Sequence, residues 1–265
     1  MDLGLEGRRA VVTGGSRGIG KAVARKLAGE GVRTAICART REPLEVSAKE
    51  IEAETGTEVV PIVADVRDRA AIEAFVATAA ERLGGVEIVV NCAARVSGGT
   101  PEDLEHVTEE TILGDFDEKF LGALRVVRAA LPHLRRAGWG RIVNVSGLTA
   151  RTAGQVSAGA RNIALVHLTK TLSVVLGRDG VTANAVYPAL TVTESLEERL
   201  AARAEREGWT REELLAQLSK NNAIGRLVTA NEIADVVLFL VSERSVCITG
   251  EAIAVGGGPG TSVFY

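Results

Sequence analysis

Tyrosine is almost missing from this sequence of 265 residues, in which only Tyr187 and Tyr265 occur. Cysteine is scarce as well: Cys37, Cys92 and Cys247 cannot all pair, and their spacing is not that of metal ligands. We therefore expect no metal site and a reducing, cytoplasmic setting. No apolar run approaches the ~18 residues of a membrane span, and the first residues lack the apolar segment of a signal peptide.

An excess of basic charge is also lacking. Lys and Arg number 31 against 34 Asp and Glu, so the formal net charge is -3, which predicts no nucleic-acid partner. Hydrophobic residues make up 46% and charged residues 25%, a balance that excludes a disordered chain. The length suits one α/β domain with a sizeable core.

Apolar runs of strand length alternate with longer stretches of helical period along the chain. The predicted strands are 8–13, 32–38, 58–64, 86–92, 141–146, 181–187 and 251–255. The predicted helices are 19–30, 43–55, 69–83, 110–137, 162–176 and 231–241. Because the strands are continuously hydrophobic, we expect them to be buried on both faces, as in a parallel sheet. The sequence predicts a single-domain, doubly wound Rossmann fold over residues 1–265, with a parallel seven-stranded sheet flanked by helices.

One segment interrupts this alternation. Residues 194–222 are charged and helix-prone, and they follow the carboxyl end of a predicted strand. Ligands of open α/β sheets bind beyond those ends, so we interpret the segment as a helical lid over a small-molecule substrate. The alternative is a helical excursion into solvent.

A glycine-rich loop follows the first predicted strand. The sequence TGGSRGIG, Thr13–Gly20, leads directly into a helix. Glycines let a backbone approach a pyrophosphate closely, and a helix N-terminus offers free N–H groups and a positive dipole end. In the order strand, loop, helix and strand, the loop predicts dinucleotide binding.

The choice of dinucleotide depends on the end of the second strand. A NAD-binding chain carries an acid there for the ribose 2′-hydroxyl, whereas this sequence has Ala38 and Arg39, with Arg17 inside the glycine loop. Two guanidiniums suit a 2′-phosphate, so we expect NADP(H). Alternatively, both arginines serve only solubility. Asp65, after the third strand, can accept from the adenine amino group.

Several motifs together resemble the short-chain dehydrogenase/reductase family over nearly the whole chain. They are TGGSRGIG, Asp65-Val66, NCAA (Asn91–Ala94), GRIVNVSG (Gly140–Gly147), NAVYPALTVT (Asn184–Thr193) and ITGEAIAVGGG (Ile248–Gly258). The resemblance implies that Asn91 braces the sheet, Pro188 lies against the nicotinamide and Thr193 bonds its carboxamide. The cofactor-binding residues expected from the loop and the resemblance are Gly14, Ser16, Arg17, Gly18, Ile19, Gly20, Arg39, Asp65, Val66, Asn91, Ala93, Asn162, Pro188 and Thr193.

The redox residues of that family are a Tyr-xxx-Lys pair on one helix, a serine at a strand end and an asparagine on an earlier helix. The phenol protonates the alkoxide left by hydride transfer, and the lysine one turn away lowers its pKa. Here Ala158 stands at the tyrosine position, Asn162 at the lysine position and Gly147 at the serine position. The interval from Gly147 to Ala158 is about two residues short, and the stretch from Cys92 to Val143 contains no further asparagine, with 115–119 in its place.

Few residues can replace the missing acid. Tyr187, at the end of the sixth strand, is one candidate and Ser146 is another, although a packed, hydrogen-bonded tyrosine is the simpler interpretation. Arg161 either holds an anionic substrate or points to solvent. Asn162 can bond the nicotinamide ribose hydroxyls without supplying charge. For Cys92 an inert buried thiol is the default, and for His106 a surface position.

Two functions follow. The first is an NADP(H)-dependent oxidoreductase with a substituted active site that acts on a carbonyl, an imine or a conjugated substrate. The second is a non-redox enzyme, of the dehydratase or cyclase type, or an inactive relative that binds a nucleotide or a partner. Apolar residues at helical spacing in 110–137 and 162–176 exceed what one sheet can cover, so we expect a homo-oligomer, a tetramer as in the family.

Overall fold

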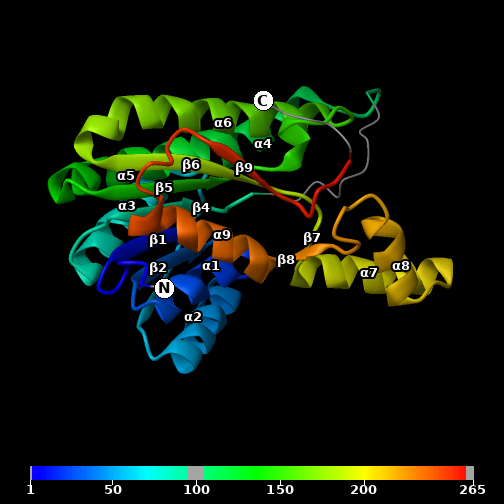
Figure 1. Cartoon of the computed structure of the whole chain (residues 1–265), viewed down its shortest axis with the longest axis horizontal. Coiled ribbons are helices and arrows are strands. Elements are labelled where there is room, and N and C mark those ends of the chain that lie inside the picture. Colours follow the sequence, from blue (N-terminus) through cyan, green and yellow to red (C-terminus); the bar gives the residue numbers. More distant parts are fainter. Residues whose placement is uncertain (1, 95–103, 261–265) are drawn as a thin grey trace.

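One parallel sheet forms the centre of the molecule (Figure 1). The computed structural model describes residues 2–94 and 104–260. Within these ranges seven strands pair in the order β3-β2-β1-β4-β5-β6-β9, all parallel. Their bounds are β1 Arg9–Thr13, β2 Arg33–Ala38, β3 Val59–Val63, β4 Ile88–Asn91, β5 Gly140–Val145, β6 Val181–Pro188 and β9 Ala252–Val255. The predicted doubly wound Rossmann fold is confirmed.

Helices cover both faces of the sheet (Figure 1). One face carries α1 Gly18–Gly29, α2 Arg41–Thr55 and α9 Ala230–Val241, and the other carries α3 Arg69–Leu83, α5 Gly122–Ala137 and α6 Val156–Leu176. Each layer closes its own hydrophobic core against the strands. Burial on both sides explains why the central strands β1, β4, β5 and β6 are continuously apolar. The same expectation was wrong for β3 and β9, which lie at the edges of the sheet and are partly exposed. Short 3₁₀ turns lie at Leu148–Ala150, Gly177–Asp179 and Glu243–Ser245.

Two predicted helices differ from the observed ones. The segment predicted as one helix over 110–137 is divided into α4 Glu109–Phe116, the π-helical turn η1 Asp117–Leu121 and α5. A π-turn shifts the helical phase without any glycine or proline signal, so periodicity alone could not place it. The helix predicted from Asn162 begins at Val156, because the small residues before Asn162 carry no apolar period.

Residues 194–222 form a helical hairpin at the carboxyl ends of the strands (Figure 1). It consists of α7 Glu194–Glu207 and α8 Arg211–Ser219, which share a small core of leucines (Leu196, Leu200, Leu214 and Leu227). The short strands β7 Thr191–Val192 and β8 Val228–Thr229 pair at its base. Two-residue strands are too short to leave a pattern, and the sequence did not predict them. No helix in the described part of the chain has the length and hydrophobicity that a bilayer crossing requires.

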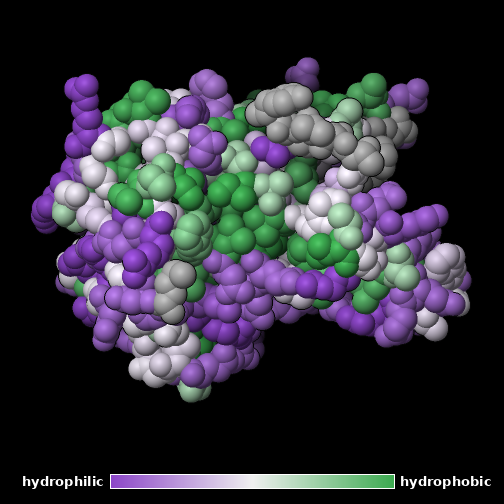
Figure 2. All heavy atoms as spheres, viewed as in Figure 1, coloured by the Kyte–Doolittle hydropathy of each residue, from purple (hydrophilic) through white to green (hydrophobic). Residues whose placement is uncertain are grey.

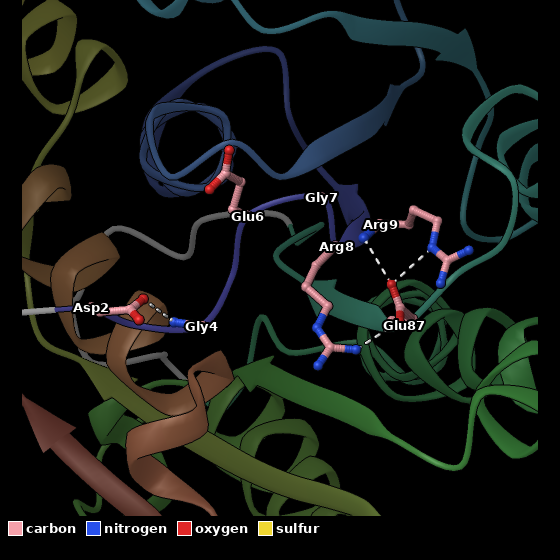
Figure 3. A pocket seen from close by; sticks show the side chains of 7 residues that line it. All are labelled: Asp2, Gly4, Glu6, Gly7, Arg8, Arg9 and Glu87. Atoms are coloured by element: carbon pink, nitrogen blue, oxygen red, sulfur yellow. Dashed lines mark hydrogen bonds and ion pairs between the residues drawn. The ribbon is translucent and has the colours of Figure 1, made fainter.

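The amino ends of β1 and β4 are fastened by a charged cluster (Figure 3). The Glu87 carboxylate accepts from the Arg9 backbone at 3.2 Å, from Arg9 Nε at 2.8 Å and from Arg8 Nη1 at 2.9 Å. The Arg8 guanidinium also lies 3.8 Å from the centre of the Trp139 ring. The small pocket that these residues line lies at the edge of the sheet opposite the glycine loop.

Removal of this carboxylate tests how much the fold depends on the cluster. Burial disfavours the charged form of Glu87, but hydrogen bonds from Arg9 and Arg8 outweigh it and hold its pKa below the usual value. Because truncation leaves two guanidiniums without their shared partner, we expect Glu87→Ala to cost about 3 kcal/mol in urea unfolding. The control Glu73→Ala, in the exposed Arg69–Glu73 pair, should cost under about 0.5 kcal/mol.

The pH dependence has a definite sign. A carboxyl group whose pKa is lowered by folding stabilises the folded protein at pH values above its unfolded-state pKa of about 4.3. This stabilisation is lost as the pH falls through the folded-state pKa. The wild type should therefore lose stability faster than Glu87→Ala below about pH 4. Equal slopes of the two unfolding free energies against pH in that range would contradict the assignment.

Candidate functional site

The glycine loop occupies the turn between β1 and α1. Gly14 has φ +70°, and a Cβ there would lie 3.1 Å from the Ala93 backbone. A Cβ on Gly20 would collide with the Gly14 carbonyl. Thr13 Oγ1 accepts from the backbone N–H groups of Cys92 and Ala93, which holds the end of β4 beside the loop. The chain thus approaches itself closely here and leaves the N-terminus of α1 uncovered by side chains of the loop.

A residue from the predicted lid reaches this loop. The Glu194 carboxylate, in the first turn of α7, accepts from the Gly18 backbone N–H at 2.9 Å. Ser16 and Ile19 are partly exposed on the loop, and Arg17 is exposed at the N-cap of α1. Thr193 caps α7 by accepting from the Leu196 N–H, and its methyl group lies beside Gly18. Glu194 was not among the residues predicted for the site.

The edge near β2 and β3 carries the residues predicted for the adenosine end. Arg39 is exposed after β2, with Nη1 3.9 Å from Glu118 Oε1. Asp65 accepts from the Arg67 backbone and guanidinium, and these hydrogen bonds hold the pKa of its carboxyl below the usual value. Val66 packs against Gly122, where a Cβ would lie 3.0 Å from it.

A chain of amides joins the strand ends at the centre of the sheet. Asn91 Nδ2 donates to Asn144 Oδ1 at 2.8 Å, and Asn144 Nδ2 donates to Thr169 Oγ1 at 2.9 Å. Asn91 is buried, and its Oδ1 has no hydrogen-bond partner among the described residues. β4, β5 and α6 are thereby fixed side by side, in agreement with the bracing expected of Asn91. Pro188 ends β6 at the same edge of the sheet.

The positions expected for the redox residues lie together at the end of β5. Asn162 Nδ2 donates to Thr149 Oγ1 at 2.6 Å, and a Cβ on Gly147 would lie 2.7 Å from this nitrogen. Ser146 Oγ donates to the Asn162 carbonyl at 3.0 Å. Ala158 is buried on the same helix. The backbone positions aligned with the redox residues of the family therefore lie close together, although the interval between Gly147 and Ala158 is short.

Tyr187 is buried under another side chain. The Arg151 guanidinium carbon lies 4.5 Å from the centre of its ring, and Arg151 also donates to the Ala252 carbonyl. The packing agrees with the simpler interpretation of Tyr187, but the hydrogen bond expected of its hydroxyl group is not found among the described residues. Tyr265 lies outside the described residues.

Buried charge lies between α4 and α6. The Asp115 carboxylate accepts from Ser157 Oγ at 2.6 Å and pairs with Arg161 at 3.2 Å. Arg161 is only 3% exposed, so the expectation that it points to solvent is wrong. An ion pair is retained inside a protein when it is also hydrogen-bonded, and Ser157 provides such a bond.

Lys119 lies beside this ion pair, on the π-helical turn η1. Its side chain is 7% exposed, and Nζ donates to the Ser146 carbonyl at 2.9 Å. Burial and the nearby Arg161 guanidinium lower the pKa of this ammonium to about 7. Burial raises the pKa of the neighbouring Cys92 thiol to about 12, so the thiol stays protonated.

Sequence reasoning missed the contacts of Lys119, Asp115 and Glu194. One signal was present for Arg161, the partner of Asp115 and the only Asp, Glu, Lys or Arg between Arg151 and Lys170, because a charge in such a stretch must be paired or functional. Asp115 and Lys119 stand among other charged residues and gave no such signal. No cluster of metal-ligating side chains occurs in residues 2–94 and 104–260. His106 lies exposed in a turn before α4, at the surface position expected for it.

Comparison with known proteins agrees with this geometry. The profile of a family described as enoyl-(acyl carrier protein) reductase matches residues 14–259. The chain is 36% identical to the short-chain reductase protein NovJ of Streptomyces niveus over 94% of its length and 92% of the relative. It is also 36% identical to the granaticin polyketide synthase putative ketoacyl reductase 1 of Streptomyces violaceoruber, over 95% of this chain and 92% of the relative.

Solved structures resemble the fold over almost its full length. L-Sorbose reductase from Gluconobacter frateurii, complexed with NADPH and L-sorbose, superposes with a TM-score of 0.92 at 26% identity, over 99% of this chain and 100% of that one. A single-substitution variant of the actinorhodin polyketide ketoreductase with NADPH superposes with a TM-score of 0.84 at 32% identity, over 94% of this chain and 96% of that one. The matched profile, the relatives and the glycine loop at the switch point of the sheet agree, and the chain belongs to the short-chain dehydrogenase/reductase family.

Proposed function

We propose that this protein is an NADP(H)-dependent oxidoreductase that reduces a ketone at the carboxyl edge of its sheet. The glycine loop carries the proposal: Gly14 and Gly20 pack so closely against the Ala93 backbone and the Gly14 carbonyl that neither has room for a Cβ, and this tight turn lies at the N-terminus of α1, where a pyrophosphate can bind. The solved relatives named above hold NADPH. A bound NADPH supplies the hydride, and the residues of this chain orient it and exclude water.

Each part of the dinucleotide has residues to receive it. Gly14, Ser16, Gly18, Ile19 and Gly20 surround the pyrophosphate. Arg17 and Arg39 receive the 2′-phosphate, because no acid of the β2 end competes for the ribose. Asp65 and Val66 border the adenine, and Asn91, Ala93, Asn162, Pro188 and Thr193 border the nicotinamide riboside.

The substrate class follows from the relatives and from the site. Relatives include putative ketoacyl reductases and a 3-oxoacyl-[acyl-carrier-protein] reductase from Staphylococcus aureus that is 31% identical. We propose a ketone of the 3-oxoacyl thioester type as the substrate of this chain. The α7–α8 hairpin, residues 194–222, is the lid over this substrate. Its first residue, Glu194, contacts the glycine loop, and the hairpin lies at the carboxyl ends of the strands.

The active site is substituted rather than lost. Ala158, Asn162 and Gly147 supply no acid, and general acid catalysis is worth about 10² to 10⁴ in rate, so reduction needs another proton donor. Of the first candidates, Ser146 Oγ is engaged by a carbonyl and Tyr187 is covered by Arg151. The function is tested by incubating the protein with NADPH and either an acetoacetyl thioester or L-sorbose. Consumption of NADPH is measured as the loss of nicotinamide absorbance. Tight NADPH binding without any turnover would instead favour a non-redox or inactive relative.

We also propose a homotetramer in the cytoplasm. The location rests on the cysteine pattern alone, and all three cysteines are free thiols. A tetramer with two-fold axes needs two different interfaces. Leu113 of α4 and Ile163 of α6, two helices in contact with each other, are both exposed. Figure 2 shows a second apolar area over α9 and β9, and Phe239 of α9 is exposed.

The cofactor preference is tested at Arg39. Hydrogen bonds to charged groups contribute about 1.5–3 kcal/mol, so Arg39→Asp should weaken NADPH binding about 10- to 100-fold and leave NADH binding almost unchanged. Fluorescence titration measures both. The control is Arg41→Asp, two residues away in an exposed pair with Glu45. Equal affinities of the unmutated protein for NADPH and NADH would overturn the assignment.

The lid carboxylate should oppose cofactor binding. Glu194 occupies a backbone N–H at the positive end of α1, where a pyrophosphate would also bind, and two anions compete for that end. Glu194→Gln should therefore tighten NADPH binding about two- to fivefold. Glu198→Gln, an exposed change on the same helix, should not. Unchanged affinity in Glu194→Gln would show that the carboxylate and the phosphate do not compete.

Light scattering of the purified protein tests the assembly. We expect the mass of four chains at micromolar concentration. Leu113→Glu combined with Ile163→Glu should release dimers held by the α9 and β9 surface, because a buried unpaired charge disfavours an interface. The mass of a single chain in the unmutated protein would refute the tetramer.

A further inference from the structure

The π-helical turn η1 directs a lysine into the candidate active site. Lys119 lies in the middle of Asp117–Leu121, between α4 and α5. A π-turn inserts an extra residue into the helix and rotates the side chains that follow, which is why such turns occur at functional sites. Here the result is a lysine side chain buried against the ends of β4 and β5, away from the solvent that lysine normally reaches.

The hydrogen bonding of Lys119 is incomplete. An ammonium carries three N–H donors, and in the described residues its Nζ has one acceptor, the Ser146 carbonyl at 2.9 Å. No carboxylate of the described chain forms an ion pair with it. A buried cation with unused donors is costly unless another acceptor enters the site. Ser146 directly precedes Gly147, the position at which the family places its substrate-binding serine.

The charged and titratable groups around Lys119 belong to α4, η1, α6 and the end of β4. Asp115 of α4 is engaged by Ser157 and Arg161, and Glu118 of η1 lies near Arg39. Cys92, after β4, is a protonated thiol, and the Arg161 guanidinium of α6 repels a second positive charge. Together with burial, this repulsion outweighs both carboxylates and brings the pKa of Lys119 to about 7. A proton is therefore released at neutral pH.

We propose that Lys119 is the proton donor of this site, and thus the catalytic acid that the helix α6 lacks. The inference rests on the proposed ketone reduction and names the residue that completes it. As a hydride reaches the carbonyl carbon of the substrate, the π electron pair moves to oxygen, and the oxygen takes a proton from Lys119 Nζ. The products are the alcohol, NADP⁺ and a neutral amine, which regains a proton from the solvent.

Two substitutions at this position separate the acid from a structural role. Lys119→Met fills nearly the same volume without a proton and should lower kcat for acetoacetyl thioester at least about 100-fold, with NADPH affinity within threefold of the wild type. Lys119→Gln is a second replacement that can still donate to the Ser146 carbonyl, and it should be equally slow. Lys170→Met, at a lysine that is 61% exposed on α6, should keep full activity.

The pH profile and a direct titration provide independent readouts. Only the ammonium donates a proton, so kcat of the wild type should fall as the pH rises through about 7, and the residual rate of Lys119→Met should not follow this profile. Among the six lysines of the chain, the isotope-labelled Cε signal that disappears in Lys119→Met should titrate near neutrality, with and without NADPH.

The outcomes distinguish this inference from the function on which it rests. A wild type that binds NADPH but reduces no ketone counts against the proposed function. Turnover by Lys119→Met within about tenfold of the wild type overturns the role of Lys119 alone. Loss of NADPH binding in both Lys119 variants also overturns it, in favour of a lysine that holds the cofactor. A Lys119 signal that titrates with the other lysines overturns it whether or not turnover is found.

Discussion

The chain of amides from Asn91 through Asn144 to Thr169 is the interaction on which the site depends. It ties the ends of two neighbouring strands to the middle of α6 inside the protein, through two buried side-chain hydrogen bonds. The turn after β5, the π-helical turn and the first half of α6 are all positioned relative to these three residues. The glycine loop is attached to the same edge through Thr13. A shift of one strand would move every element of the site at once.

Buried charge is the second constraint at this edge. Asp115, Glu118, Lys119 and Arg161 are all buried where α4 and η1 meet α6, two carboxylates with two basic side chains. Buried ion pairs are weak evidence for stability, since apolar replacements often stabilise a protein equally well. Their presence in a small site beside Ser146 is better explained by chemistry than by folding.

The sequence predicted the sheet and the dinucleotide end well, because both follow from local rules. Continuous apolar strands and a glycine loop before a helix have few alternative structures, and the seven strands were found where expected. The catalytic end was harder to predict. Arg161 was expected either to bind an anion or to face solvent, and neither interpretation included its pairing with a residue of α4. Lys119 depends on a π-turn that changes the helical phase, and Glu194 depends on a contact across 176 residues of sequence. Such contacts come from tertiary packing rather than from local patterns.

The contact between Gly147 and Asn162 has a consequence for how the site can change over generations. A side chain at position 147 would overlap the Asn162 amide nitrogen, so a serine there is compatible only with a different residue, or another rotamer, at position 162. The two positions are therefore coupled, and the effects of substituting them do not add. Because the overlapping nitrogen is the end of a flexible side chain, another rotamer of Asn162 can admit a serine at position 147, at the cost of its hydrogen bond to Thr149.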